Sequence, residues 1–171
     1  MTRWGRSSRY AGSKDRAAVR DHVFDVLRQR RLAAHLGGGD TGRALMIGIL
    51  RARGAALDAL FNGQGHAPLP VSEQEHEAPA APSDIGTLWN LPEWILPRFT
   101  ASLGDRAEAA AMALQARAPI TLRVNTARSD RAAARAALAA DGVDTVANPL
   151  APTALTVTEG PRKIRNSTVY L

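Results

Sequence analysis

The 171-residue chain contains no cysteine. That absence excludes disulfide bridges, thiolate metal sites and a cysteine nucleophile within these residues. Long apolar runs are also missing, since no segment approaches the roughly 18 apolar residues that a membrane-spanning helix needs. The basic start, MTRWGRSSRYAGSKDR, is followed by no apolar segment of signal-peptide length. We therefore expect a cytoplasmic protein that makes no contact with a membrane.

The spacing of the histidines and glycines does not predict a metal site or a cofactor site. The four histidines show no ligand spacing with carboxylates, so we predict no metal site. The stretch GGGDTG at residues 37–42 fits the G-x-G-x-x-G pattern, but it follows the helical segment LRQRRLAAHL instead of a strand. A dinucleotide site needs the strand-to-helix context. We predict no catalytic residue and no cofactor-binding residue in this chain.

Acidic residues are few in the first third of the chain. Residues 1–60 hold 12 Lys and Arg against 5 Asp and Glu, a net charge of +7, whereas residues 61–171 hold 10 against 11, a net charge of −1. A basic segment attached to a nearly neutral one indicates an element that binds a polyanion, most simply RNA. A basic surface that only aids solubility is the alternative.

The first sixty residues have helical periodicity and a basic face. Ser13 is placed to cap a helix over 14–34, which the glycines of GGGD end. Its apolar stripe comprises Val19, Val23, Val26, Leu27 and Leu32. Candidate RNA-binding residues on its other face are Arg16, Arg20, Arg28, Arg30 and Arg31. An ordinary solvated helix face is the alternative interpretation of these arginines.

Further helices and a linker complete the expected organisation. A second helix covers about 41–53, and a third runs through AALDALF. The stretch 63–84 is rich in proline, alanine and acidic residues and has no periodicity, which is typical of a linker. We thus expect a basic helical segment over 1–62, a linker over 63–84 and an α/β unit over 85–171.

Two helices are expected to open the third part. Pro92 fits the first turn of one helix, which Gly104 ends. Asp105 is placed to cap the Ala-rich helix RAEAAAMALQAR, which Pro119 breaks. Tryptophans at positions 4, 89 and 94 are interpreted as packing residues instead of platforms for base stacking.

A one-sided sheet is expected after these helices. Alternation in APITLRVN predicts a strand with Ile120, Leu122 and Val124 on one side and Thr121, Arg123 and Asn125 on the other. Ser129 is placed to cap a helix that Gly142 ends, and VDTVA and ALTVT supply further strands. The last strand has Leu155 and Val157 inward and Thr156 and Thr158 outward. RNA-recognition and ferredoxin-like domains share such units, so the fold class is α+β.

The polar face of this sheet is the second candidate RNA surface. It carries Arg123 and Asn125, and Arg128, Arg131 and Arg135 extend the basic surface along the next helix. The face lacks the aromatic residues on which bases stack, so we expect contacts to phosphates and to RNA shape. Ordinary helix solvation is the alternative for the helix arginines.

Three stretches together resemble a known family. LPEWILPRFTASLGD, ALQARAPITLRVNTARSDRAAARAALAADGV and TALTVTEGPRKIRNSTVYL are similar to the region just before the catalytic domain in bacterial ribosomal-RNA cytosine-C5 methyltransferases of the Sun/Fmu (RsmB-like) family. The resemblance covers about residues 88–171. RYAGSKDRAAVRDHVFDVLRQRR also resembles the helical start of that family, whose longer members carry a domain similar to the antitermination factor NusB.

The resemblance implies the role of a fragment. Family members bind S-adenosylmethionine on a doubly wound catalytic domain, which would follow residue 171, and use a cysteine to attack C6 of cytosine. It therefore implies an RNA-binding N-terminal portion of such an enzyme, with ribosomal RNA and a C-terminal methyltransferase domain as partners. This portion would be catalytically silent alone.

A protein-interaction module is the alternative function. In that case the Ala-rich helix and the segment from Trp89 to Phe99 would dock on a catalytic domain. Arg123 and Asn125 would then be groups of the domain interface. Exposure of Arg123 and Asn125 in residues 1–171 is the observation expected to separate the two interpretations.

Overall fold

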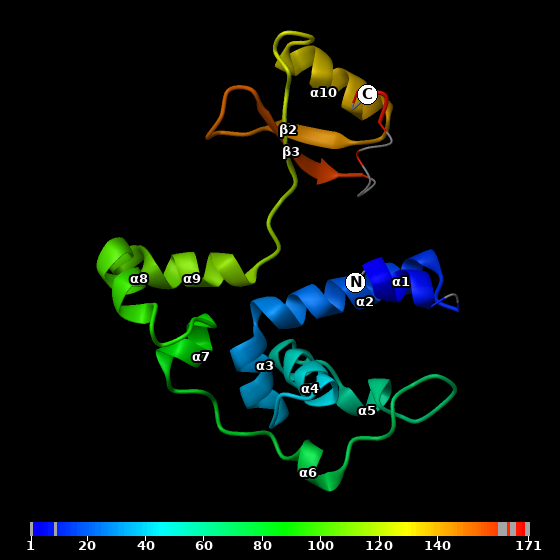
Figure 1. The fold of residues 1–171 in the computed structure, drawn as a ribbon, viewed down its shortest axis with the longest axis vertical. Helices are drawn as coiled ribbons and strands as arrows, with labels where there is room; N and C mark the ends of the chain where they lie inside the picture. The colour runs from blue at the N-terminus through cyan, green and yellow to red at the C-terminus, as the bar shows by residue number, and fades with distance from the viewer. Residues whose placement is uncertain (1, 9, 161–163, 165–166, 170–171) are drawn as a thin grey trace. The chain divides into compact units, whose positions relative to one another are not determined.

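A computed structural model describes residues 2–8, 10–160, 164 and 167–169 of the chain. The chain divides into two compact units, Met1–Arg117 (unit 1) and Ala118–Leu171 (unit 2). The expected boundaries at 62/63 and 84/85 do not coincide with this division. Helices make up the described part of unit 1 and a small antiparallel sheet forms unit 2, which confirms the α+β class (Figure 1).

Unit 1 is built from short helices. They are α1 (Thr2–Ser7), α2 (Ser13–Arg28), α3 (Arg30–Gly37), α4 (Gly42–Ala52), α5 (Leu57–Leu60), α6 (Glu73–His76), α7 (Ile85–Trp89), α8 (Leu96–Leu103) and α9 (Ala107–Gln115), with a 3-10 turn, η1 (Gly104–Arg106), before α9. No helix in the described ranges is long and apolar enough to span a membrane.

The helix predicted over 14–34 is two helices. Gly12, not Ser13, is the N-cap of α2, and its N–H donates to the Asp15 carboxylate at 2.9 Å. The helical conformation is interrupted at Gln29, so α3 starts in a new direction. The predicted apolar stripe is not covered along α2, where Val23 and Leu27 are 37% and 59% exposed. The stripe prediction was wrong for these two residues.

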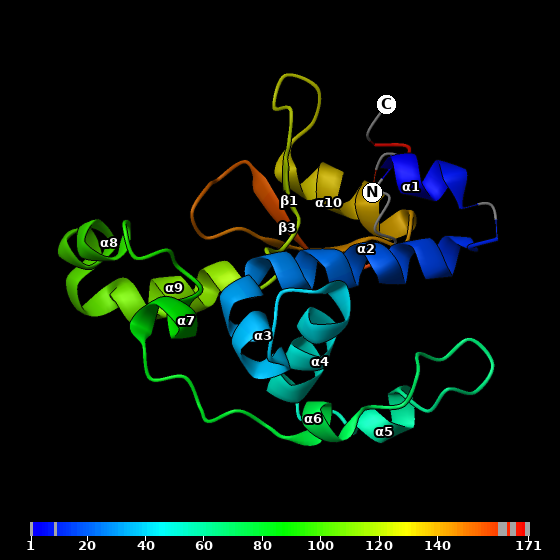
Figure 2. The ribbon, with the colours of Figure 1, turned by 60° about the horizontal axis from the view of Figure 1, so that its bottom comes forward.

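Helices α3 and α4 form the most closely packed pair of unit 1 and lie side by side in Figure 2. Gly48 of α4 lies against the backbone of α3, where a Cβ atom would approach the Ala33 carbonyl oxygen to 1.9 Å. In the same way, Gly37 of α3 lies against the backbone of α4, where a Cβ atom would approach the Ala44 carbonyl oxygen. Gly38 has φ of 73° and ends α3, as the GGGD stretch predicted. GGGDTG therefore joins two helices.

Residues 63–84 pack onto the preceding helices. Val71 is buried in a cluster with Ile47 of α4 and Phe61. Arg43 of α4 donates to both carboxylate oxygens of Glu75 at 2.7 and 2.9 Å, and the Ser72 hydroxyl caps α6. A local pattern gave no sign of these contacts because the partners lie up to 32 residues apart.

Helices α7 to α9 complete unit 1. The Asn90 side chain joins three segments, accepting from the Leu32 N–H at 3.1 Å and donating to Gln115 Oε1 at 2.9 Å. Trp89 packs against Phe99 with ring centroids 6.3 Å apart, as expected, whereas Trp94 is 73% exposed, so its assignment as a packing residue was wrong.

The predicted ends of the last two helices of unit 1 were partly wrong. Helix α8 has Pro97, not Pro92, in its first turn, and it ends at Gly104 as predicted. Asp105 lies in η1 and does not cap α9, which follows Arg106 directly. The Ala-rich helix also ends at Gln115, before Pro119 is reached.

Unit 2 is a three-stranded sheet covered by one helix (Figure 1). Its elements are β1 (Thr121–Arg123), α10 (Arg131–Ala140), β2 (Asp144–Ala147) and β3 (Ala154–Glu159). The strand order is β1-β3-β2, and β3 runs antiparallel to both neighbours. The strands β1 and β2 are therefore parallel to each other and joined through α10, a split β-α-β unit of the kind found in ferredoxin-like folds.

The core of unit 2 lies between α10 and one face of the sheet. It contains Ala134, Leu138, Val143, Leu155 and Ile164, with Ile120, Leu122, Val124 and Val157 packed against it. This confirms the predicted inward sides of β1 and β3. The cap of α10 is Asp130, whose carboxylate accepts from the Ala133 N–H at 2.8 Å, and not Ser129. Gly142, with φ of 74°, follows the end of α10 as predicted.

Candidate nucleic-acid interface

The five arginines predicted on the first helix all have partners within unit 1. Arg20 pairs with Asp21 at 3.1 Å, and Arg28 pairs with Asp25 at the same distance. Arg30 pairs with Asp40 and Arg31 with Glu93. Arg16 donates to the carbonyl oxygen of Gly5 at 3.3 Å. An arginine beside a carboxylate contributes less positive field than the residue count suggests, and it must exchange that partner to bind a phosphate.

Unit 2 carries a different set of arginines. Arg123 lies on β1, Arg128 in the loop after it, and Arg131 and Arg135 on α10. All four side chains are exposed, and none pairs with a carboxylate in the described part of the chain. Arg131 and Arg135 are four residues apart and so share one face of α10. Residues 118–171 hold seven Lys and Arg against four Asp and Glu, a net charge of +3.

The uncovered face of the sheet is mainly polar. Thr121 of β1 stands opposite Thr156 of β3, which stands opposite Val146 of β2. Arg123 is on the same face as Thr121, because the two are separated by one residue of the strand. Thr158 is exposed as predicted, while Val146, 45% exposed, was not considered. No aromatic side chain belongs to this row of described residues.

Asn125 lies beyond β1, in the turn that leads to Arg128. Its Oδ1 atom accepts from the Ala127 N–H at 3.2 Å, and its carbonyl oxygen accepts from the N–H groups of Arg128 and Ser129 at 2.9 and 3.1 Å. Such an Asx turn fixes the backbone locally. The residue that the alternation placed on the sheet face therefore holds the loop that presents Arg128.

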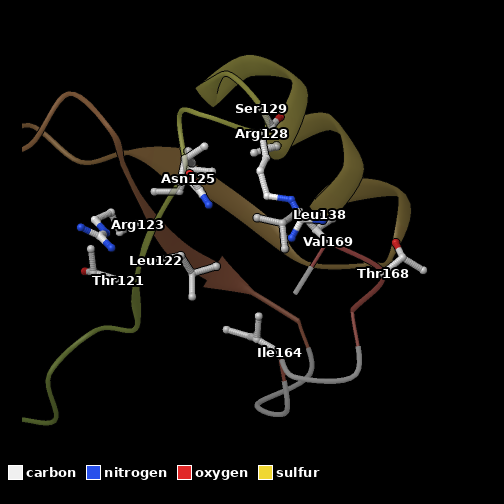
Figure 3. Close-up of a pocket in the computed structure, with 13 residues that line it drawn as sticks. Thr121, Leu122, Arg123, Asn125, Arg128, Ser129, Leu138, Ile164, Thr168 and Val169 are labelled. Atoms are coloured by element: carbon white, nitrogen blue, oxygen red, sulfur yellow. The ribbon is translucent and has the colours of Figure 1, made fainter. Parts of the chain in front are cut away.

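A groove of about 650 Å³ opens in unit 2 beside this turn. Its walls include Leu122 of β1, Leu138 of α10 and Ile164 near the end of the chain. Figure 3 shows Arg128 extending from the loop toward Leu138 and Val169, with Asn125 on the same side. Thr121 and Arg123 lie on the other side of β1 from Leu122 in that view.

One wall of the groove is held by Asp141, at the end of α10. Its carboxylate accepts from the Ser167 hydroxyl at 2.6 Å and from the Thr168 N–H and hydroxyl at 2.9 Å each. These hydrogen bonds lower the pKa of Asp141, and the one from Ser167 has the largest effect. Sequence reasoning assigned no role to Asp141, Leu138 or Thr168, because partners 26 and 27 residues apart leave no local pattern.

The comparisons with known proteins agree with the earlier resemblance. A family model described as the ferredoxin-like domain of RsmF/B-like methyltransferases matches residues 91–164. The match includes α8 and α9 of unit 1 and the sheet of unit 2, and it covers less than half of the chain. No curated protein and no solved structure matches the chain. Residues 91–164 are therefore similar to the ferredoxin-like domain of the RsmF/B-like methyltransferases.

Proposed function

We propose that this chain is the RNA-binding N-terminal portion of an S-adenosylmethionine-dependent ribosomal-RNA (cytosine-C5) methyltransferase that works in the cytoplasm. Its task is to hold structured RNA in register for a catalytic domain outside these 171 residues. That domain would supply the attacking cysteine and the cofactor site. GGGDTG does not fit the cofactor, since it lies between two helices and lacks the strand-to-helix turn of such sites.

One observation carries the proposal: Arg123 on the uncovered face of the sheet, Arg128 in the loop after β1, and Arg131 and Arg135 on α10 have no carboxylate partner among the described residues. A guanidinium without a protein partner can bind phosphate without first breaking an ion pair. Arg123 and Asn125 are exposed, so both remain accessible to a ligand. The sheet face lacks aromatic side chains, which favours contacts to phosphates and RNA shape over base stacking.

The paired arginines of α2 and α3 take a secondary role in this proposal. Each of their ion pairs is at least partly exposed, and exposed pairs are weak and screened by salt. They therefore add to a diffuse attraction for RNA, while Arg123, Arg128, Arg131 and Arg135 make the closer contacts.

The test is filter binding of a ribosomal-RNA helix at several salt concentrations. Replacing Arg131 and Arg135 together by Ala should reduce the slope of log affinity against log salt by about 1.4 to 1.8, the value for two phosphate contacts. The matched control, Arg98→Ala, removes an exposed arginine of unit 1 and should reduce affinity far less. Equal effects of the double variant and the control would contradict the proposed interface.

Docking on a catalytic domain is the second candidate function. It is favoured by apolar side chains that the described chain leaves uncovered in the segment expected to dock: Trp94 is 73%, Met112 43% and Leu114 61% exposed. If RNA binding is insensitive to salt, or absent, while a Leu114→Glu variant loses association with a separately expressed methyltransferase domain, this function replaces RNA positioning.

A further inference from the structure

We propose that the groove beside Arg128 binds one unstacked nucleotide of the RNA, with the phosphate at Arg128 and the base against the aliphatic walls. This inference rests on the proposed function and names a site within it. The groove lies mainly on the side of the sheet that faces α10, where Leu122 and Leu155 stand opposite each other, although Thr121 and Arg123 of the other face also border it.

The walls of the groove suit a flat apolar ligand. The half-buried Leu122 and the exposed Val169 border it, and the core residues Leu138, Leu155 and Ile164 form its buried floor. Its volume of about 650 Å³ falls in the range of small-molecule sites. Such a pocket lets an unstacked base bury its faces against side chains even where no aromatic residue is present. The guanidinium plane of Arg128 offers one further surface on which a base can stack.

The polar groups at the groove are donors. Arg128 carries five N–H donors and has no carboxylate partner among the described residues. The side-chain oxygen Oδ1 of Asn125 accepts a hydrogen bond within the turn, which leaves the side-chain N–H groups for a ligand. The Thr168 hydroxyl is spent as a donor to Asp141. The free N–H donors of Arg128 and Asn125 favour a ligand that brings acceptors, such as phosphate oxygens and base carbonyls.

The charge at the groove favours RNA over a protein segment. Among the described residues that line it, Arg128 is the charge on the side of β1 that carries Leu122, Arg123 lies on the other side of that strand, and no acidic side chain is included. A polypeptide would have to bring its own carboxylates to this position, whereas each nucleotide carries a phosphate. The Asp141 carboxylate accepts from Ser167 and Thr168 and so stabilises one wall of the groove.

The inference is tested with the full chain and a fluorescein-labelled single-stranded RNA pentanucleotide, followed by fluorescence anisotropy. Val169→Trp places an indole at the mouth of the groove from a residue that is 38% exposed. It should weaken pentanucleotide binding about tenfold, the loss of roughly one base contact. The matched control is Val146→Trp, at a residue that is 45% exposed on the opposite face of the sheet, and it should change affinity less than about twofold.

Two further arms make the result specific. Arg128→Ala should weaken binding of the pentanucleotide. Arg128→Lys should keep part of the affinity, because lysine restores the positive charge but not the planar guanidinium group. Cytidine 5′-monophosphate should compete with the pentanucleotide better than cytidine or inorganic phosphate does. Thermal unfolding of each variant verifies that unit 2 is intact.

The outcomes separate this inference from the proposed function. The nucleotide site would be overturned if the wild-type chain binds the ribosomal-RNA helix normally but Val169→Trp binds the pentanucleotide as tightly as the wild type does. The groove would then be left to a polypeptide. Loss of salt-dependent helix binding in the wild-type chain would overturn the proposed function itself.

Discussion

Gly48 lies directly against the carbonyl oxygen of Ala33, so that the two helices α3 and α4 touch through their backbones. A Cβ atom at this position would be 1.9 Å from that oxygen, a distance that side-chain rotation cannot relieve because the obstacle is backbone. Ala33 is fully buried at the same contact. The close approach therefore depends on the absence of a side chain at residue 48.

Gly48→Ala should destabilise unit 1 by about 3 kcal/mol, since the helices must separate to admit one methyl group. The control is Gly42→Ala in the same helix, where the added Cβ meets nothing within 4 Å and alanine is the better helix former. Urea unfolding followed by circular dichroism measures both. Equal stability of the two variants would show that the helices do not meet in this way.

Thr145→Val should stabilise unit 2 by about 1 kcal/mol. The Thr145 side chain is 4% exposed, and its hydroxyl lacks a hydrogen-bond partner among the described residues. A buried hydroxyl without a partner carries a desolvation cost that an isosteric methyl group removes. Thr158→Val, at an exposed position of β3, should change the free energy of unfolding by less than about 0.5 kcal/mol. A stability loss for Thr145→Val would indicate that the hydroxyl has a partner.

The packing of 63–84 should weaken in acid. The hydrogen bond from Arg43, followed by that from the Ser72 N–H, lowers the pKa of Glu75 from 4.5 to about 2. A carboxyl group with a lowered folded-state pKa stabilises the folded form above its ordinary pKa, and this contribution is lost as the pH falls toward 2. Relative to an unfolded reference peptide digested by pepsin at the same pH, 63–84 should thus be cut faster at pH 2 than at pH 4.5. In Glu75→Gln, cleavage should already be fast at pH 4.5. A wild-type rate that does not differ between the two pH values would contradict the role of this pair.

Residues 1–171 should not bind S-adenosylmethionine. Calorimetry at millimolar cofactor should give only the heat of dilution, because GGGDTG joins two helices and does not follow a strand. A saturable isotherm would place the cofactor site in this chain.

Local patterns predicted much of unit 2, and the reason is visible in its elements. Alternation gave the inward side of β1 and β3, and Gly142 gave the end of α10, since these features depend on neighbours in the sequence. The caps were misplaced by one residue: Asp130 and Gly12 are used where Ser129 and Ser13 were expected. Both members of each pair are acceptable caps, so the backbone geometry decides between them.

Long-range pairing escaped prediction. Arg31 meets Glu93 and Arg43 meets Glu75, at separations of 62 and 32 residues, and neither partner can be identified from a periodic pattern. These unpredicted ion pairs limited the prediction of the candidate site most. The number of arginines in residues 1–60 does not tell which of them already pair with a carboxylate. Likeness of the helical part to NusB stays a prediction, since the family match begins at residue 91.

The strand order β1-β3-β2 also sets a sequence of events during synthesis. The central strand is the last of the three to leave the ribosome, and β1 and β2 have no backbone partner in the described sheet until it arrives. Hydrophobic residues of β1 must wait, exposed or loosely collapsed, for about thirty residues of further translation, and those of α10 for fewer. The sheet of unit 2 therefore forms late, when Leu155 is inserted between Leu122 and Ala147, and Ile164 joins the core after it.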